Sequence, residues 1–269
     1  MTSADLADRV SGSLALGPAG VDGLSSRPPR VGPSRRSWAR ELAWFTVPLA
    51  LCPLVAVLRP GDGAIAMERG RRLLEWQRSL GVAIEPSVHG WFSARPVLAA
   101  AVMIFYLAAH LSAVIATACW LAARRPQAYL RFRRTFATAQ VITIATYVAV
   151  PVAPLRMVLT GNTSAAGATW TRSIQYEFAA MPSGHVVFAL VVGVAVWRHA
   201  PPRWRWLGVA HASCTLVAVV ATAHHLLADA AVAALVVVAG AFLVRVTDAV
   251  PERTRVTLGL VTNRGSGAV

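Results

Sequence analysis

Two short groups of polar residues, about forty positions apart, have the composition of a site that binds and cleaves a phosphate ester. In the first group, Pro182 and Ser183 precede Gly184, His185 and the apolar run 186–192, which predicts a helix capped by Ser183. Free backbone N–H groups and a partial positive charge make a helix N-terminus suited to anions. We therefore predict that Ser183 and Gly184 hold phosphoryl oxygens and that His185 donates a proton.

The second group, His225 and Asp229, supplies a candidate nucleophile. Their i, i+4 spacing places both side chains on one face if this segment is helical. A carboxylate that holds one imidazole nitrogen fixes the tautomer and leaves the other nitrogen free to attack phosphorus. Asp229 is also the only acidic residue between Glu177 and Asp248. We interpret His225, Asp229 and His185 as the catalytic residues.

These residues resemble the motifs of the type 2 phosphatidic acid phosphatase superfamily, loosely from about Glu68 to Val244. The second motif of that family reads Pro-Ser-Gly-His, as at 182–185, and its third motif ends in His-x-x-x-Asp, as at 225–229. The resemblance implies that a phosphohistidine forms on His225 and that His185 protonates the leaving group.

The third motif departs from the family pattern at its start. The family has Ser-Arg where this chain has Ala218 and Val219, so a phosphate-binding arginine is absent there. This departure, together with Thr222 and the pair His224-His225, is more similar to the inositol phosphorylceramide synthase branch, which transfers a phospho-headgroup between lipids. We include Thr222 and His224 as residues that line the site.

Composition predicts an integral membrane protein. Hydrophobic residues make up 56% of the chain and charged residues 14%, and the formal charge of +14 comes from arginine because the chain has no lysine. The aromatic-basic interleaving typical of nucleic-acid binding is missing, so the arginines are interpreted as topology signals. Cys52, Cys119 and Cys214 lie in apolar runs, and we expect neither a disulfide nor a metal or other cofactor.

The predicted fold class is all-α: a bundle of six transmembrane helices with interfacial amphipathic helices. The expected spans are 42–58, 97–123, 135–155, 183–197, 206–223 and 226–244. The segment 64–93 mixes apolar residues with arginines and glutamates, which favours a solvated ledge in the interface plane over a direct role in binding substrate. The membrane domain, 37–246, is expected between a disordered cytoplasmic tail, 1–36, and a cytoplasmic C-terminal tail, 247–269.

Arginine placement predicts the orientation. Clusters at 27–40, 124–134, 198–205 and 245–255 fall on one side if six helices alternate. This arrangement indicates a multi-pass protein of the cell membrane with cytoplasmic termini and an extracytoplasmic active site. The arginines of 69–78 oppose it, although Glu68, Glu75 and Glu85 partly balance their charge.

The same topology separates the arginines that can reach the site from those that cannot. The arginines of 131–134 lie across the bilayer from the two histidines and are excluded. Arg156 and Arg172 lie on the predicted outer side, and we expect them to bind phosphate because a guanidinium can grip it bidentately. His110 and His211 lie inside spans and are interpreted as packing or interhelical hydrogen-bond residues.

Two classes of function remain open. The first is a membrane enzyme that transfers the phosphoryl group of a lipid phosphate to water, as a phosphatase, or to an alcohol, as a transferase. The second is a non-catalytic scaffold or transporter. The missing third-motif arginine favours the second class slightly, and the pair His225 and Asp229 favours the first more. The expected partners are the lipid bilayer and a phosphorylated lipid, and the sequence indicates no oligomeric state.

Overall fold

The computed structural model describes residues 41, 43–47, 63–161 and 178–249, all within one compact unit, Ala39–Val269. This described part is helical and has no strand beyond an isolated bridge between Val152 and Ala179. Its helices, in chain order, are α2 (Gly63–Ser79), α3 (Glu85–Ser93), α4 (Pro96–Arg124), α5 (Pro126–Ala149), α6 (Leu155–Thr160), α8 (Gly184–His199), η1 (Pro202–Trp204), α9 (Trp206–Ala221) and α10 (Leu227–Ala249). The predicted tail 1–36 and most of the first expected span, 42–58, lie outside the described residues.

Proline and serine begin the helices that form the bundle. Pro96 and Pro126 occupy the first turns of α4 and α5, where a missing N–H leaves no helical hydrogen bond unmade. Ser183 caps α8 as predicted, because its Oγ accepts the N–H of Val186 at 3.4 Å. The helix that holds the expected span 135–155 starts earlier and ends earlier than the span, at Pro126 and Ala149. Since α5 begins at Pro126, only Arg125 separates it from α4, and the arginines of 131–134 lie within it.

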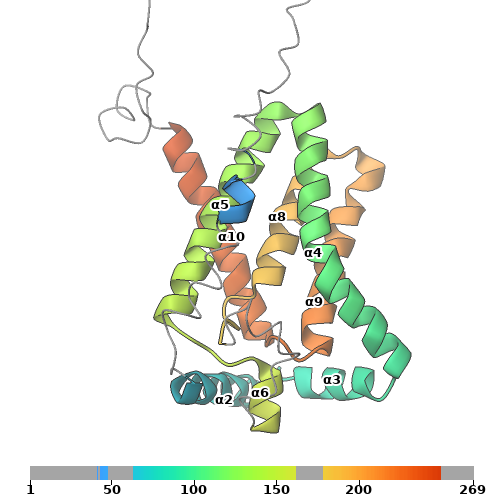
Figure 1. Cartoon of the computed structure of the whole chain (residues 1–269), viewed down its shortest axis with the longest axis vertical. Coiled ribbons are helices and arrows are strands. Elements are labelled where there is room, and N and C mark those ends of the chain that lie inside the picture. The colour runs from blue at the N-terminus through green and yellow to red at the C-terminus, as the bar shows by residue number, and fades with distance from the viewer. Residues whose placement is uncertain (1–40, 42, 48–62, 162–177, 250–269) are drawn as a thin grey trace, which may run out of the picture. The chain divides into compact units, whose positions relative to one another are not determined.

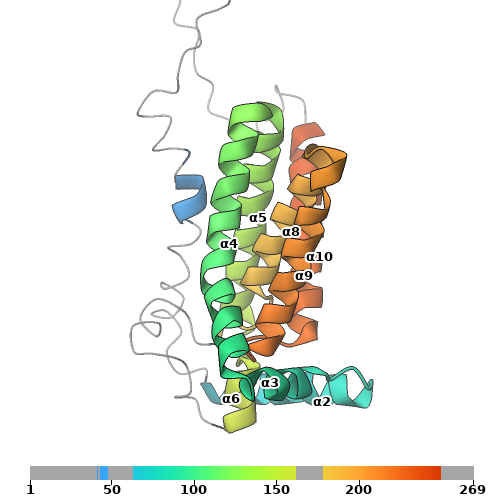
Figure 2. The same ribbon diagram turned by 90° about the vertical axis from the view of Figure 1, so that its right-hand side faces the viewer.

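Five helices, α4, α5, α8, α9 and α10, lie side by side, with α2 and α3 across one end of this bundle (Figures 1 and 2). They enclose a shared core that includes Phe136, Val187 and Val219. Helices α8 and α9 approach closely where Gly193 faces Gly208: a Cβ added to Gly208 would lie 2.7 Å from the Gly193 carbonyl oxygen. Small residues allow such close contact between apolar helices.

Length and composition show which helices are able to cross a membrane. In the described part, three stretches are long and apolar enough to span a membrane, Pro96–Arg124, Pro202–Ala221 and Leu227–Ala249, and Gly184–His199 is a shorter apolar helix. Their outer faces expose large apolar side chains, among them Leu107 and Phe242, which suit contact with lipid. The chain is therefore a helical membrane protein, whereas the count of six spans stays a prediction.

Helices α2 and α3 have one exposed and one buried side. In α2, Arg72 and Trp76 are exposed while Leu74 and Gln77 are buried. Glu85, at the start of α3, is completely buried. Glu85, counted with the acids that partly balance the arginines of 69–78, therefore points inward, and its carboxylate bonds to the start of α10.

Candidate active site

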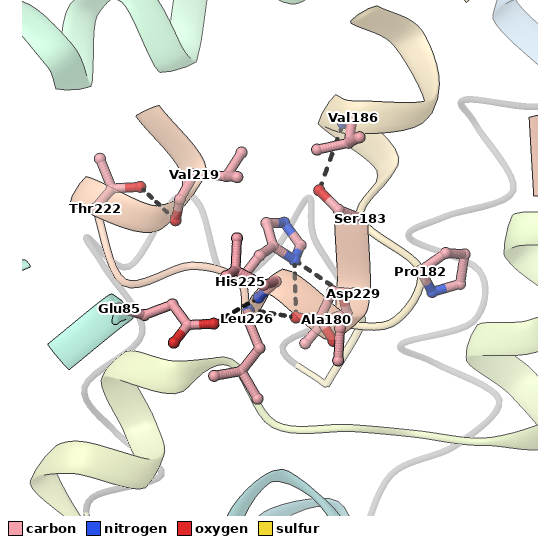
Figure 3. A network of polar contacts seen from close by, with 12 residues as sticks. Glu85, Ala180, Pro182, Ser183, Val186, Val219, Thr222, His225, Leu226 and Asp229 are labelled. Carbon is pink, nitrogen blue, oxygen red and sulfur yellow. Dashed lines mark hydrogen bonds and ion pairs between the residues drawn. The ribbon is translucent and has the colours of Figure 1, made fainter. Parts of the chain in front are cut away.

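The side chain of His225 is oriented by the backbone of the other motif. His225 lies in the turn between α9 and α10, and its Nδ1 is 2.8 Å from the carbonyl oxygen of Ala180 (Figure 3). A carbonyl oxygen can only accept a hydrogen bond, so Nδ1 carries the hydrogen and donates it. The Nε2 atom of the neutral ring then keeps its unshared electron pair. This arrangement leaves Nε2 as the ring atom of His225 that could act as a nucleophile.

The carboxylate expected to hold His225 is farther away than the Ala180 carbonyl. Oδ2 of Asp229 lies 3.5 Å from Nδ1 of His225, and it accepts the N–H of Leu226 at 2.8 Å. The expectation that both side chains share a helical face is wrong, because α10 begins at Leu227, after His225. Asp229 is the third residue of α10 and reaches back to the N–H that precedes the helix, as in a capping box. Its charge remains placed to stabilise a cationic imidazole at 225.

Backbone groups at the start of α8 are available for an anion. The N–H groups of Gly184 and His185 donate to no acceptor in the described part of the chain. Ser183 is fully buried, and its N–H donates to the Asp229 carbonyl at 3.1 Å, so the next two residues are the better candidates to hold phosphoryl oxygens. Gly184 leaves room for this approach, since a Cβ there would lie 3.1 Å from the Tyr147 hydroxyl.

An aromatic cluster surrounds His185. The ring of Tyr106 stacks on His185, with centroids 4.0 Å apart, and on His224, with centroids 4.4 Å apart. His110 packs edge-on against His185 at 4.4 Å, and the centroids of His185 and His225 are 6.2 Å apart. His110 packs between helices as predicted, and the ring that it packs against, His185, belongs to the candidate site. The i, i+4 spacing of Tyr106 and His110 was the available signal.

Arg156 lies close to the same cluster. Its backbone N–H, in α6, donates to the Ala223 carbonyl at 2.7 Å, which fixes α6 against the turn that carries His224. Burial lowers the pKa of the His224 imidazole well below its usual value, and the positive charge of Arg156 lowers it further. The structure therefore brings this arginine to the site on which the sequence motifs converge.

The other predicted site residues lie elsewhere or have another role. Oγ1 of Thr222 donates to the Ala218 carbonyl at 2.7 Å, so its hydrogen is used at the end of α9. Arg133 and Arg134 pair with acidic residues at the opposite end of the bundle, as expected from their exclusion. Arg172 lies outside the described residues.

Sequence reasoning missed two buried polar residues of the surface helices. Oε1 of Glu85 accepts the N–H of Leu227 at 2.6 Å, and Oε1 of Gln77 accepts the N–H of Ala228 at 2.9 Å. The available signal was the position of Gln77, three residues after the buried Leu74 on the apolar face of α2. Together with the carboxylate of Asp229, these two side chains accept the N–H groups of residues 226–228 at the start of α10.

No group of three or more His, Cys, Asp or Glu side chains among the described residues is arranged to hold a metal ion.

Comparisons with known proteins place the chain in a family. Neither a search among curated proteins nor a search among solved structures found a match. The sequence model of the PAP2 superfamily matches residues 71–244, which is more than half of the chain and includes both histidine motifs. The chain therefore belongs to the PAP2 superfamily, that is, the type 2 phosphatidic acid phosphatase superfamily.

Proposed function

We propose that this protein is an integral membrane phosphatase that hydrolyses a lipid phosphate through a phosphohistidine at His225. The observation that carries the proposal is the 2.8 Å hydrogen bond from His225 Nδ1 to the Ala180 carbonyl, which leaves Nε2 free to react. His185 lies opposite, at 6.2 Å between ring centroids, so a phosphate ester between the rings can contact both. Membership of the PAP2 superfamily supports phosphatase or phosphotransferase chemistry.

The proposed reaction is a double displacement. Nε2 of His225 donates its electron pair to phosphorus, and the bond from phosphorus to the lipid oxygen breaks. Protonated His185 gives its proton to that oxygen, which leaves as an alcohol. Water then attacks phosphorus while neutral His185 takes its proton, and the phosphorus–nitrogen bond breaks with its electron pair returning to Nε2. Asp229 stabilises the positive charge that the phosphorylated imidazole carries between the two steps.

Binding of the phosphoryl group is assigned to two kinds of donor. The N–H groups of Gly184 and His185 at the start of α8 hold its oxygens, and Arg156 neutralises their charge. The lipid character of the substrate is supported by α4, in which Tyr106 is buried against the histidines while Leu107 on the same turn is exposed. A bound phosphate would thus lie one helix width from the surrounding lipid.

An alternative acceptor is supported by the altered third motif. Ala218 and Val219 are buried in α9, and the Val219 carbonyl accepts the N–H groups of His224 and His225 at 3.1 and 3.3 Å. An arginine at 219 would disturb this packed turn, so Arg156 replaces it in the proposal. This departure favours a phosphotransferase of the inositol phosphorylceramide synthase type, in which an alcohol takes the place of water. A non-catalytic scaffold or transporter is the remaining alternative.

Radiolabelled lipid phosphates test the proposal directly. Purified protein is incubated briefly with phosphatidic acid, polyprenyl phosphate or phosphoinositide and quenched in alkali, which preserves phosphohistidine. We expect label on the wild type and none on His225→Ala. Asp229→Asn should reduce labelling by about 10²-fold, less than the roughly 10⁴-fold loss in a catalytic triad, because the Ala180 carbonyl also fixes the tautomer.

Control variants and acceptors complete this experiment. His199→Ala, which removes a histidine at the far end of α8, should label like the wild type. Added acceptor alcohols distinguish the two enzymes, since only a transferase yields a new phospholipid. Absence of both label and turnover across the whole lipid panel would favour the scaffold alternative.

A further inference from the structure

A single short helix contacts the chain on both sides of the turn that carries His225. From α3, Nδ1 of His89 is 2.8 Å from the Ala221 carbonyl, at the end of α9, and donates to it. From the same helix, Oε1 of Glu85 accepts the N–H of Leu227, the first residue of α10, at 2.6 Å. Because 85 and 89 are spaced i, i+4, both side chains lie on one face of α3.

The contact at α10 is buried and shared with α2. Glu85 and Gln77 are 0% and 1% exposed, and Nε2 of Gln77 donates to Oε1 of Glu85 at 2.5 Å. Oε1 of Gln77 in turn accepts the N–H of Ala228 at 2.9 Å. Figure 3 shows the Glu85 carboxylate beside the segment that joins His225 to α10. The start of α10 is thus held by side chains from the helices that lie across the end of the bundle.

We propose that Glu85 and His89 of α3 are positioning residues that hold the ends of α9 and α10 and thereby place His225 for attack. The inference rests on the proposed function of His225 and adds residues that touch no substrate. His225 belongs to neither helix, and within the described part of the chain Nδ1 of its ring has polar contacts with the Ala180 carbonyl and the Asp229 carboxylate. The separation between Ala221 and Leu227 therefore sets, together with the bonds of His225 to Val219 and Ala180, where Nε2 lies relative to a bound phosphate.

Activity measurements distinguish positioning from binding. Since the proposed phosphate ligands are Arg156 and the start of α8, Glu85→Leu and His89→Leu should each lower kcat by about 10- to 100-fold with KM changed by less than about threefold. Glu85→Gln keeps an oxygen that accepts the Leu227 N–H, and it should restore kcat to within about threefold of the wild type. Glu75→Leu, an exposed acid of α2, is the matched control and should leave both constants unchanged.

Hydrogen exchange supplies a readout that does not depend on turnover. Amides of residues 222–230 should exchange faster in Glu85→Leu and His89→Leu than in the wild type, and Glu75→Leu should not differ. If Glu85→Leu does not fold, His89→Leu alone decides, because its bond is only partly buried. Wild-type kcat, or a rise in KM alone, in a folded variant would overturn the inference. If the wild type has no turnover, the proposed function fails, but the exchange experiment still tests the inference. Faster exchange of residues 222–230 in Glu85→Leu and His89→Leu would still support the positioning of this turn by α3, and unchanged exchange would overturn it.

Discussion

The two ends of the helix bundle use charged residues in opposite ways. Where α4 meets α5, Arg133 pairs with Glu41, and Arg134 pairs with Asp248, whose side chain is 33% exposed. At the other end, the side chain of Asp229 is only 1% exposed and bonds to a backbone N–H. At the first end these charges pair with side chains of opposite charge, whereas at the second end the buried carboxylates of Asp229 and Glu85 also accept backbone N–H groups.

This difference distinguishes ion pairs that can be substituted at little cost in stability from buried carboxylates that determine the geometry of the backbone around His225. A partly exposed ion pair such as Arg134–Asp248 stabilises a protein by about 0–1 kcal/mol, because water solvates both partners when it breaks. A buried carboxylate needs hydrogen-bond donors, and around His225 these donors include the N–H groups of Leu226 and Leu227, just before and at the start of α10. We therefore expect substitutions at the two ends to differ in kind, with function affected at one end and at most stability at the other.

The largest expected contrast between the ends is their side of the membrane, which the arginine clusters predict. In a background with the three native cysteines replaced by alanine, Ser79→Cys at the α2 end should react in intact cells with a membrane-impermeant maleimide. Gln127→Cys at the start of α5 should react after permeabilisation only. Gln127 is chosen because it is exposed and its replacement removes no arginine that directs topology. The reverse pattern would move the active site to the cytoplasmic face.

Much of the helical framework follows from local sequence signals, whereas the interior of the site does not. Ser183 before an apolar run predicted the start of α8, and the apolar run 97–123 predicted α4 to within a residue at each end. The partner of His225 was not predictable, since it is the carbonyl of Ala180 and any residue type provides a carbonyl. Tyr106 resembles a packing residue on an apolar helix until α4 and α8 are placed together.

Replacing Arg156 should weaken phosphate binding strongly, whereas replacing Arg134 should leave it unchanged. Arg156→Ala should weaken inhibition by vanadate by about 10- to 100-fold, the loss of one hydrogen bond between charged groups. Arg134→Ala is the matched control, because its guanidinium pairs with Asp248 at the far end. Vanadate inhibition constants of the two variants check this expectation. Equal constants would remove Arg156 from the phosphate site and leave the start of α8 as its only proposed ligand.

The smallest expected effect concerns His224 and pH. Burial, and then the charge of Arg156, lowers the folded-state pKa of this histidine below that of the unfolded chain. As the pH falls below about 6.5, this histidine therefore binds a proton in the unfolded state but not in the folded state. The free energy of unfolding decreases over that range. His224→Phe keeps a ring to stack on Tyr106 and removes the titrating group. Between about pH 7.5 and about pH 5.5, its melting temperature in detergent should fall by about 2–5 °C less than that of the wild type. Equal falls for the two proteins would mean that protonation of His224 does not distinguish the folded from the unfolded state.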